Sequence, residues 1–149
     1  MSFLNSTHRW KRAGKTWQSM GLENTGRIGR IVVDPRDANV VYVAALGHSY
    51  GPQEERGVYK TTDGGQTWSR VLFVDENTGA SDIALDVNNP DILIAGMWQL
   101  EITTWLRNSG GPGSGLYITK NAGETWDKLE GGGLPKSPWG KVAVGIAPG

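Results

Sequence analysis

A twelve-residue stretch that occurs twice constrains the fold of this chain more than any other feature. Gly57–Trp68 reads Gly-Val-Tyr-Lys-Thr-Thr-Asp-Gly-Gly-Gln-Thr-Trp, and Gly115–Trp126 reads Gly-Leu-Tyr-Ile-Thr-Lys-Asn-Ala-Gly-Glu-Thr-Trp. Each copy begins with residues typical of strands, continues through residues typical of turns and ends in tryptophan. Each therefore predicts a strand, a tight turn and the start of a second strand. A shorter copy, Ala13–Trp17, keeps only the end of the turn and its tryptophan.

The turns themselves carry specific chemistry. The last residue of Asp63–Gly65 and of Asn121–Gly123 is glycine, which predicts a positive φ at that position. Alanine stands in the middle of the second turn, so we expect the middle residue not to need a positive φ. The side chain at the first position of each turn can accept a backbone N–H bond that closes the turn. Arg12, at the equivalent place in the shorter copy, cannot.

The repeat extends beyond the turns, with a period of roughly 50 residues that is typical of propeller blades and other repeat architectures. Glu23–Gly26 recurs as Glu76–Gly79, and the apolar run Ile31–Asp34 recurs as Ile83–Asp86. The three copies end in tryptophans, spaced 51 and 58 residues apart, that we expect to pack in the core between blades: Trp17, Trp68 and Trp126.

The pattern Ser/Thr-x-Asp-x-Gly-x-Thr-Trp resembles the Asp box of bacterial neuraminidase (BNR) repeats. Thr61–Trp68 matches it at every position, and Thr119–Trp126 matches it with Asn in place of Asp. Asp boxes occur in the β-propellers of sialidases, xyloglucanases and sortilin-like ectodomains, so the resemblance implies that fold. Gly21–Gly149 is most similar to the large bacterial sortilin-like repeat proteins, many of which carry a glycosyl hydrolase label. The residues that carry the resemblance are Thr61, Asp63, Gly65, Thr67 and Trp68 in the first copy and Thr119, Asn121, Gly123, Thr125 and Trp126 in the second.

We therefore expect an all-β chain in the form of a partial β-propeller. Two full four-stranded antiparallel blades are predicted at about 28–73 and 82–129, with partial blades at both ends of the segment 12–149. A closed ring needs about 4–8 blades, more than 149 residues supply, so the remaining blades of a longer chain are expected partners. Residues 1–11 do not match the repeat, and we expect an unstructured N-terminal tail there.

Composition narrows the function classes. Lysine plus arginine and aspartate plus glutamate number 15 each, and no basic stripe is present, which argues against a nucleic-acid partner. The absence of cysteine excludes a disulfide framework and thiolate metal sites, and no metal or other cofactor is predicted. No apolar run approaches the ~18 residues of a membrane span. Residues 1–11 lack the apolar core of a signal peptide, whereas the family resemblance favours an extracytoplasmic location, periplasmic or secreted.

The long loops are predicted to share one end of the blades. In a four-stranded meander, the loops between the second and third strands and the connectors between blades lie on one side, opposite the tight turns. The loops at 47–56 and 98–115 and the connectors at 74–81 and 131–141 should therefore form one face. Binding residues concentrate on loops held by a rigid scaffold, so this is the candidate binding face. Its candidate ligand-contacting residues are His48, Tyr50, Glu54, Arg56, Trp98, Glu101, Trp105 and Arg107.

Several of these residues also have a plainer interpretation. A lone loop histidine such as His48 is more commonly a surface or hydrogen-bonding residue than a catalyst. Glu54–Arg56 is typical of a solvated charge run. Trp98 and Trp105 could stack on sugar rings or pack along their own loop, and the sequence leaves both open. Asp63 is expected to close its turn rather than bind a metal, since one carboxylate among glycines offers no ligand cluster.

Two functions fit these features. The first is a non-catalytic scaffold segment that binds protein or glycan through the candidate binding face. The alternative is a fragment of a glycoside hydrolase, sialidase-like or xyloglucanase-like. Glycoside hydrolysis needs a pair of carboxyl groups, for which Asp82 and Glu101 are the weak candidates here. No motif assigns the arginine cluster of a sialidase, and the lack of any complete catalytic set favours the scaffold.

Overall fold

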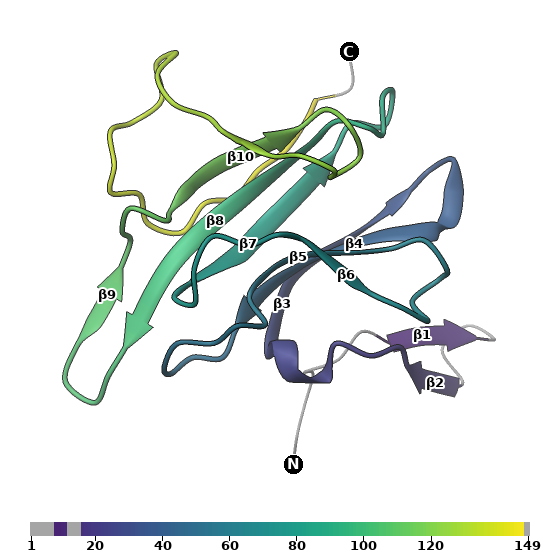
Figure 1. The fold of residues 1–149 in the computed structure, drawn as a ribbon, viewed down its shortest axis with the longest axis horizontal. Coiled ribbons are helices and arrows are strands. Elements are labelled where there is room, and N and C mark those ends of the chain that lie inside the picture. The colour runs from purple at the N-terminus through teal and green to yellow at the C-terminus, as the bar shows by residue number, and fades with distance from the viewer. Residues whose placement is uncertain (1–7, 12–15, 148–149) are drawn as a thin grey trace.

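Antiparallel strands make up nearly all the regular structure in the computed structural model, which describes residues 8–11 and 16–147 (Figure 1). Within these residues the one helical element is a short 3₁₀ helix, η1 (Glu23–Thr25). The strands form two main sheets and a short N-terminal hairpin. The all-β class predicted from the repeats is confirmed.

The first sheet is a meander of four consecutive strands. The strands are β3 (Arg27–Asp34), β4 (Asp37–Gly47), β5 (Gly57–Thr61) and β6 (Ser69–Leu72). They lie in the order β3-β4-β5-β6, and each is antiparallel to its neighbours. The turn of the first motif copy joins β5 to β6. This is the antiparallel four-stranded sheet predicted for one blade.

The second sheet repeats this meander with one addition. Its main strands are β7 (Thr78–Leu85), β8 (Leu93–Ile102), β10 (Gly115–Thr119) and β11 (Asp127–Lys128), in the order β11-β10-β8-β7. The turn of the second motif copy joins β10 to β11. The added strand, β9 (Arg107–Ser109), pairs with the far end of β8 and lies off the main path of the sheet.

Two predicted elements have different limits in the structure. β7 begins at Thr78 rather than Asp82, because its first residues pair with the extended end of β8. The segment 98–115 is not one irregular loop, since β8 continues to Ile102 and β9 returns alongside it. The apolar side chains at alternate positions 98, 100 and 102 pack in one cluster with Leu46 of the first sheet. This packing extends the strand.

The N-terminal region differs from the expected tail. β1 (His8–Lys11) pairs antiparallel with β2 (Thr16–Ser19), so residues 8–11 are held by backbone pairing. The rest of the expected tail, and the turn residue Arg12, lie outside the described residues. Trp17 on β2 is 62 % exposed, so the prediction that it packs in the core is wrong.

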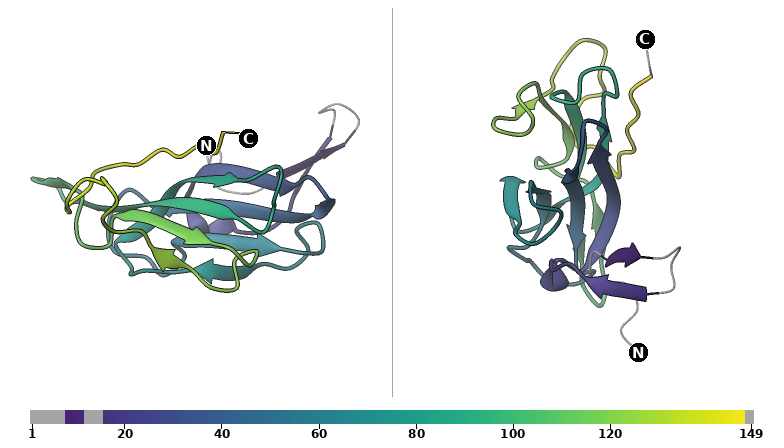
Figure 2. Two further views of the ribbon diagram at one scale, coloured as in Figure 1. Left: turned by 90° about the horizontal axis from the view of Figure 1, so that it is seen from above. Right: turned by 90° about the vertical axis from the view of Figure 1, so that its right-hand side faces the viewer.

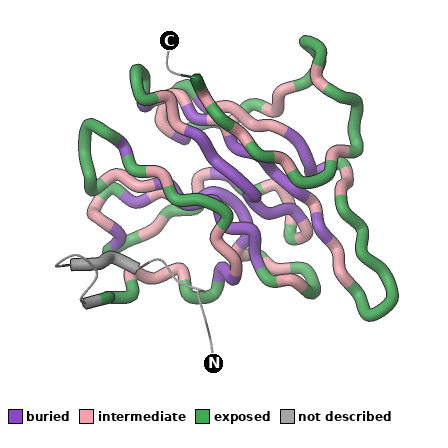
Figure 3. The backbone as a smooth tube through the Cα atoms, turned by 180° about the vertical axis from the view of Figure 1, so that it is seen from behind, coloured by how far each residue is buried: buried purple, intermediate pink, exposed green. Residues whose placement is uncertain are grey.

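The main core lies between the two sheets. Tyr42 and Ala44, at alternate positions of β4, share one cluster with Ile83, Leu93 and Met97 of the second sheet, and all five are fully buried. Burying a large apolar side chain stabilises the fold by about 1.5–3 kcal/mol. Figure 3 shows the buried residues concentrated in the central strands of both sheets. The two sheets therefore depend on each other for their shared core.

The outer faces of the two sheets are covered differently. On β3, Val32 packs against the core, whereas its neighbours Ile31 and Val33 lie on the opposite face and are 47 % and 50 % exposed. On the second sheet, residues 141–147 cover part of the corresponding face. Figure 2 shows this C-terminal segment running along one side of the sheet. The outer face of the first sheet is the more open of the two.

The C-terminal segment contacts β7 through side chains. Ser81 Oγ donates a hydrogen bond to the Val142 carbonyl at 2.7 Å, and the Val144 N–H donates to the Asp82 carboxylate at 2.9 Å. Residues 141–147 form no strand, because these contacts do not make a backbone ladder. Asp82 also pairs with Arg30 of β3 at 2.8 Å. This carboxylate thus joins the first sheet, the second sheet and the C-terminal segment.

Candidate binding face

The first motif turn, at the end of the sheets opposite the long loops, is closed by the Asp63 carboxylate. It accepts the backbone N–H groups of Gln66 and Thr67 at 2.9 Å. It also accepts the hydroxyls of Thr61 at 2.7 Å and Thr67 at 2.6 Å. These hydrogen bonds, the Thr67 hydroxyl first among them, hold the pKa of Asp63 well below its usual range. The role of Asp63 is to organise the turn.

The second motif turn is closed in the same way by a neutral side chain. Asn121 Oδ1 accepts the Thr125 N–H at 3.0 Å and the Thr119 hydroxyl at 2.8 Å, and its Nδ2 donates to Thr125 Oγ1 at 2.9 Å. The Asn-for-Asp exchange therefore keeps the geometry and removes the charge. Neither turn belongs to a group of three His, Cys, Asp or Glu side chains that could hold a metal, and none occurs elsewhere in the described residues.

The backbone of these turns corrects one prediction. Gly65 and Gly123 have positive φ values of 92° and 89°, as predicted, but the middle residue of the second turn, Ala122, also has a positive φ of 56°. The prediction that the middle position does not need a positive φ is wrong. The Ala122 carbonyl accepts hydrogen bonds from the Tyr42 hydroxyl at 2.9 Å and from Lys60 Nζ at 2.8 Å. These bonds from the first sheet hold the left-handed conformation in place.

The motif tryptophans that follow the turns serve the scaffold. Trp126 is half-buried and packs against the main core. Trp68 is half-buried too, and its indole N–H donates to the Met20 carbonyl at 2.7 Å. Trp126 therefore contributes to packing and Trp68 to a hydrogen bond within the chain.

Hydrogen bonds join the long loops into one surface at the other end of the sheets. The Gln53 N–H donates to the Glu76 carbonyl at 2.9 Å, and the Leu100 N–H donates to the Asn77 carbonyl at 3.0 Å. A β-bridge between Gly111 and Trp139 joins the two remaining segments. Because β7 begins at Thr78 and β8 continues to Ile102, the candidate binding face has narrower limits than predicted. It comprises residues 48–56, 73–77, 100–114 and 129–141.

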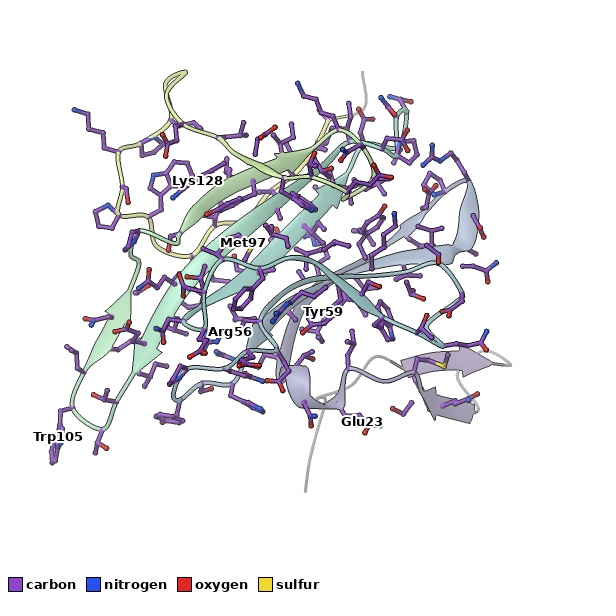
Figure 4. The ribbon with its side chains drawn as sticks, in the orientation of Figure 1. Glu23, Arg56, Tyr59, Met97, Trp105 and Lys128 are labelled. Carbon is purple, nitrogen blue, oxygen red and sulfur yellow. The ribbon has the colours of Figure 1, made fainter. Side chains whose placement is uncertain are left out.

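Arg56 is buried beneath this face, where it holds the loop backbone, and is not part of a solvated charge run. Its side chain is fully buried, and its guanidinium donates to the carbonyls of His48 at 3.2 Å, Gly51 at 3.1 Å and Asn77 at 3.0 Å. Burial is the main cause that lowers its pKa, and the charge of Arg27 adds to it. The expected exposure of Arg56 is wrong. Its position between the sheets is marked in Figure 4.

Three other candidates of this loop are available to solvent. His48 and Glu54 are exposed, and Tyr50 is 71 % exposed. The backbone carbonyl of Glu54 accepts a hydrogen bond from the Arg70 side chain. Arg56 therefore fixes the backbone of a loop whose polar side chains remain accessible.

The two tryptophans of the β8–β9 region have opposite environments. Trp98 is only 4 % exposed and packs with Leu46 and Leu100, and its indole N–H donates to Ser109 Oγ at 3.1 Å. Trp105 is 93 % exposed at the end of the hairpin (Figure 4). Of the two alternatives that the sequence left open, the structure shows packing for Trp98, against Leu46 of the first sheet and Leu100 of its own strand. Trp105 is the aromatic side chain available to a ligand.

Local hydrogen bonds order the hairpin end that carries Trp105. The Thr103 N–H donates to the Leu106 carbonyl at 2.8 Å, and the Leu106 N–H donates to Thr103 Oγ1 at 3.1 Å. The hairpin is thus closed immediately around Trp105. A side chain presented in this way loses little backbone freedom when it binds a ligand.

Asp82 and Glu101 do not form an acid–base pair. Asp82 is paired in register with Gly96 of β8, and Glu101 lies five residues further along the same strand. At about 3.3 Å per residue, this separates the two positions by roughly 16 Å, beyond the about 9.5 Å that glycosidase carboxyl pairs span. Asp82 is moreover buried and paired with Arg30. The candidate pair is therefore wrong.

This face also contains a pocket that was not predicted from the sequence. The pocket has a volume of about 390 Å³ and lies between the start of β10, the end of β11 and the following connector. The signal in the sequence was the glycine-rich and proline-rich connector itself, which carries a tryptophan. The side chains that give the pocket its chemistry are Lys128, Leu129, Glu130, Leu134, Pro135, Lys136, Ser137 and Trp139.

Two packed antiparallel meanders that carry matching turns place the chain among the β-propeller proteins. The family model described as sortilin, neurotensin receptor 3 (Sortilin-Vps10) matches residues 6–141. The chain belongs to this family. No helix in the described residues is long and apolar enough to cross a membrane.

Known proteins similar to this chain include glycoside hydrolases. The chain is 28 % identical over 139 residues to a xyloglucanase of Hypocrea jecorina (strain QM6a), a match that covers 79 % of this chain and 16 % of that protein. An ancestral GH74 enzyme matches with a TM-score of 0.64 and 21 % identity, over 86 % of this chain and 16 % of that one. The GH74 enzyme of Niastella koreensis matches with a TM-score of 0.58 and 22 % identity, over 90 % and 20 %.

These matches show how much of a related protein this chain corresponds to. The chain spans a fifth or less of each of these relatives. The two structural matches show the fold alone, because their sequence identity is low. The chain is thus a fragment-sized part of a β-propeller related to glycoside hydrolases.

Proposed function

We propose that this segment binds a glycan through the candidate binding face and supplies no complete catalytic set of its own. The observation that carries the proposal is Trp105, which is 93 % exposed on an ordered hairpin. Aromatic rings with one free face are suited to packing against the apolar face of a sugar ring. Tyr50, 71 % exposed on the same face, offers a second ring.

The likeness to a xyloglucanase suggests which glycan to test first. A neutral β-glucan such as xyloglucan offers ring faces and hydroxyl groups but no charge, which matches an uncharged aromatic side chain such as Trp105. Catalysis would then require carboxyl groups from other blades or domains of a longer chain. A protein ligand on the same face is the other form of this proposal, and a chain that binds no oligosaccharide would favour it.

The test is calorimetric titration of the chain with xyloglucan oligosaccharides. We expect Trp105→Ala to weaken binding about tenfold, the loss of one ring contact, and Trp17→Ala to leave it unchanged. Trp17 is the matched control because it is also exposed but lies on the N-terminal hairpin, away from β9 (Figure 1). Equal affinity of wild type and Trp105→Ala, or no binding of any oligosaccharide, would refute glycan binding through Trp105.

A second candidate function is favoured by the xyloglucanase and GH74 matches. In this alternative, the segment is part of a glycoside hydrolase and its face forms one wall of the catalytic cleft. Release of reducing sugar from xyloglucan by the longer protein would support it. Release by this segment alone would show that the segment contains a catalytic set, against our first proposal.

A further inference from the structure

The pocket beside β10 and β11 is a second candidate site, separate from Trp105, which does not line it. Its volume of about 390 Å³ lies within the range of small-ligand sites, about 300–1,000 Å³. This size suits one or two sugar rings rather than a long chain. Figure 4 marks Lys128 beside β10.

Hydrogen bonds fix the walls of the pocket. The Leu129 N–H donates to the Leu116 carbonyl at 2.8 Å, which holds the end of β11. The Trp139 indole N–H donates to the Pro135 carbonyl at 2.8 Å, which holds the indole within the connector. A site whose walls are already ordered loses little entropy when a ligand binds.

The charge of the pocket is positive. Lys128 and Lys136 line it together with one carboxylate, Glu130. Lys128 Nζ donates to the Pro112 carbonyl at 2.6 Å, and an ammonium group keeps two further N–H groups for a ligand. Within the described residues, neither lysine has an ion-pair partner.

Two more cations lie over the Trp98 ring, outside the residues that line the pocket. Arg107 Cζ and Lys141 Nζ lie 6.0 and 5.9 Å from the centre of the Trp98 ring. The β-bridge between Gly111 and Trp139 connects this region to the pocket wall. Neither cation is ion-paired within the part of the chain that the structure describes. Clustered unpaired cations raise the local concentration of anions and speed their association.

We propose that this pocket binds a carboxylated sugar, that is, a uronic-acid residue of an acidic glycan. The carboxylate would interact with Lys128 and Lys136, and the apolar face of the ring would pack against Trp139, Leu134 and Pro135. Glu130 and Ser137 offer acceptors for sugar hydroxyls. The inference goes beyond the proposed function, because it rests on different residues and on a charged ligand.

The test is a titration of the chain with digalacturonate and, in parallel, with the neutral disaccharide digalactose, followed by NMR. We expect digalacturonate to bind at least about tenfold more tightly. Lys136→Gln should weaken its binding about fivefold, the scale of one solvent-exposed ion pair. Lys120→Gln is the matched control, since Lys120 is exposed and follows β10 at the opposite end of the sheet, and it should change nothing.

Trp139 separates a stacked sugar from a general anion site. Trp139→Phe should retain most of the affinity and Trp139→Ala should lose about tenfold or more, with the fold checked by the amide spectrum. Trp105→Ala should leave digalacturonate binding intact, which keeps this test independent of the xyloglucan test. Equal binding of digalactose, displacement by acetate at similar concentration, or tighter binding of an acidic peptide would overturn the proposal.

Discussion

Replacing Ala122 by glycine should stabilise this protein. Ala122 has a φ of 56°, and a left-handed conformation costs an L-residue with a Cβ roughly 1–2 kcal/mol. Glycine removes this cost, but its greater freedom in the unfolded chain lowers the gain in unfolding free energy by about 0.5–1 kcal/mol. The carbonyl that accepts bonds from Tyr42 and Lys60 belongs to the backbone and is unchanged. The expected net gain is therefore about 0.5–1 kcal/mol.

Urea denaturation of wild type and Ala122→Gly measures this gain as a higher midpoint at an unchanged slope. Ala38→Gly is the matched control, because Ala38 is exposed in β4 and has no positive φ. The same exchange there should cost about 0.5–1 kcal/mol, so the two variants should shift in opposite directions. A lower midpoint for Ala122→Gly would refute the claim that the turn strains this residue.

Two further predictions concern charge and association. The lowered pKa of Asp63 means that its contribution to stability is present above the unfolded pKa of about 3.9 and is lost as pH falls toward the folded pKa. The urea midpoint should therefore fall less between pH 6 and pH 3 in Asp63→Asn than in wild type. An equal fall in the two proteins would contradict this. The exposed Ile31 and Val33 should promote self-association. In sedimentation, changing both residues to serine should lower the average mass of the species, whereas Val87→Ser should not. An average mass that the double change leaves unaltered would contradict this.

The repeat made the strands predictable because each blade repeats the same local signals. The run of strand formers before Asp63 and the glycine after it mark β5 and its turn by themselves. The inner hairpin of each sheet follows from apolar runs bounded by turn residues. These signals act over a few residues and need no knowledge of the rest of the chain.

The candidate face was less predictable because its properties depend on contacts between distant segments. Arg56 is charged and follows two glutamates, yet it is buried because carbonyls from positions 48, 51 and 77 converge on it. Trp98 and Trp105 both lie in the segment predicted as one loop, and Trp98 is buried because β8 packs on Leu46 of the first sheet. Ala122 adopts a positive φ because side chains from another sheet hold its carbonyl.

The position of Asp82 makes adjacent structural units cooperative. Its side chain is 8 % exposed, and its carboxylate accepts hydrogen bonds from the Arg30 guanidinium on one side and from the Val144 N–H on the other. If either the first sheet or the C-terminal segment moved away, the buried carboxylate would lose one of its hydrogen-bond donors. Leaving a buried charge without such a donor is costly in a medium of low polarity. Thermal fluctuations that detach the C-terminal segment are therefore opposed by the same residue that holds the first sheet. The sheets should accordingly open together rather than one after another.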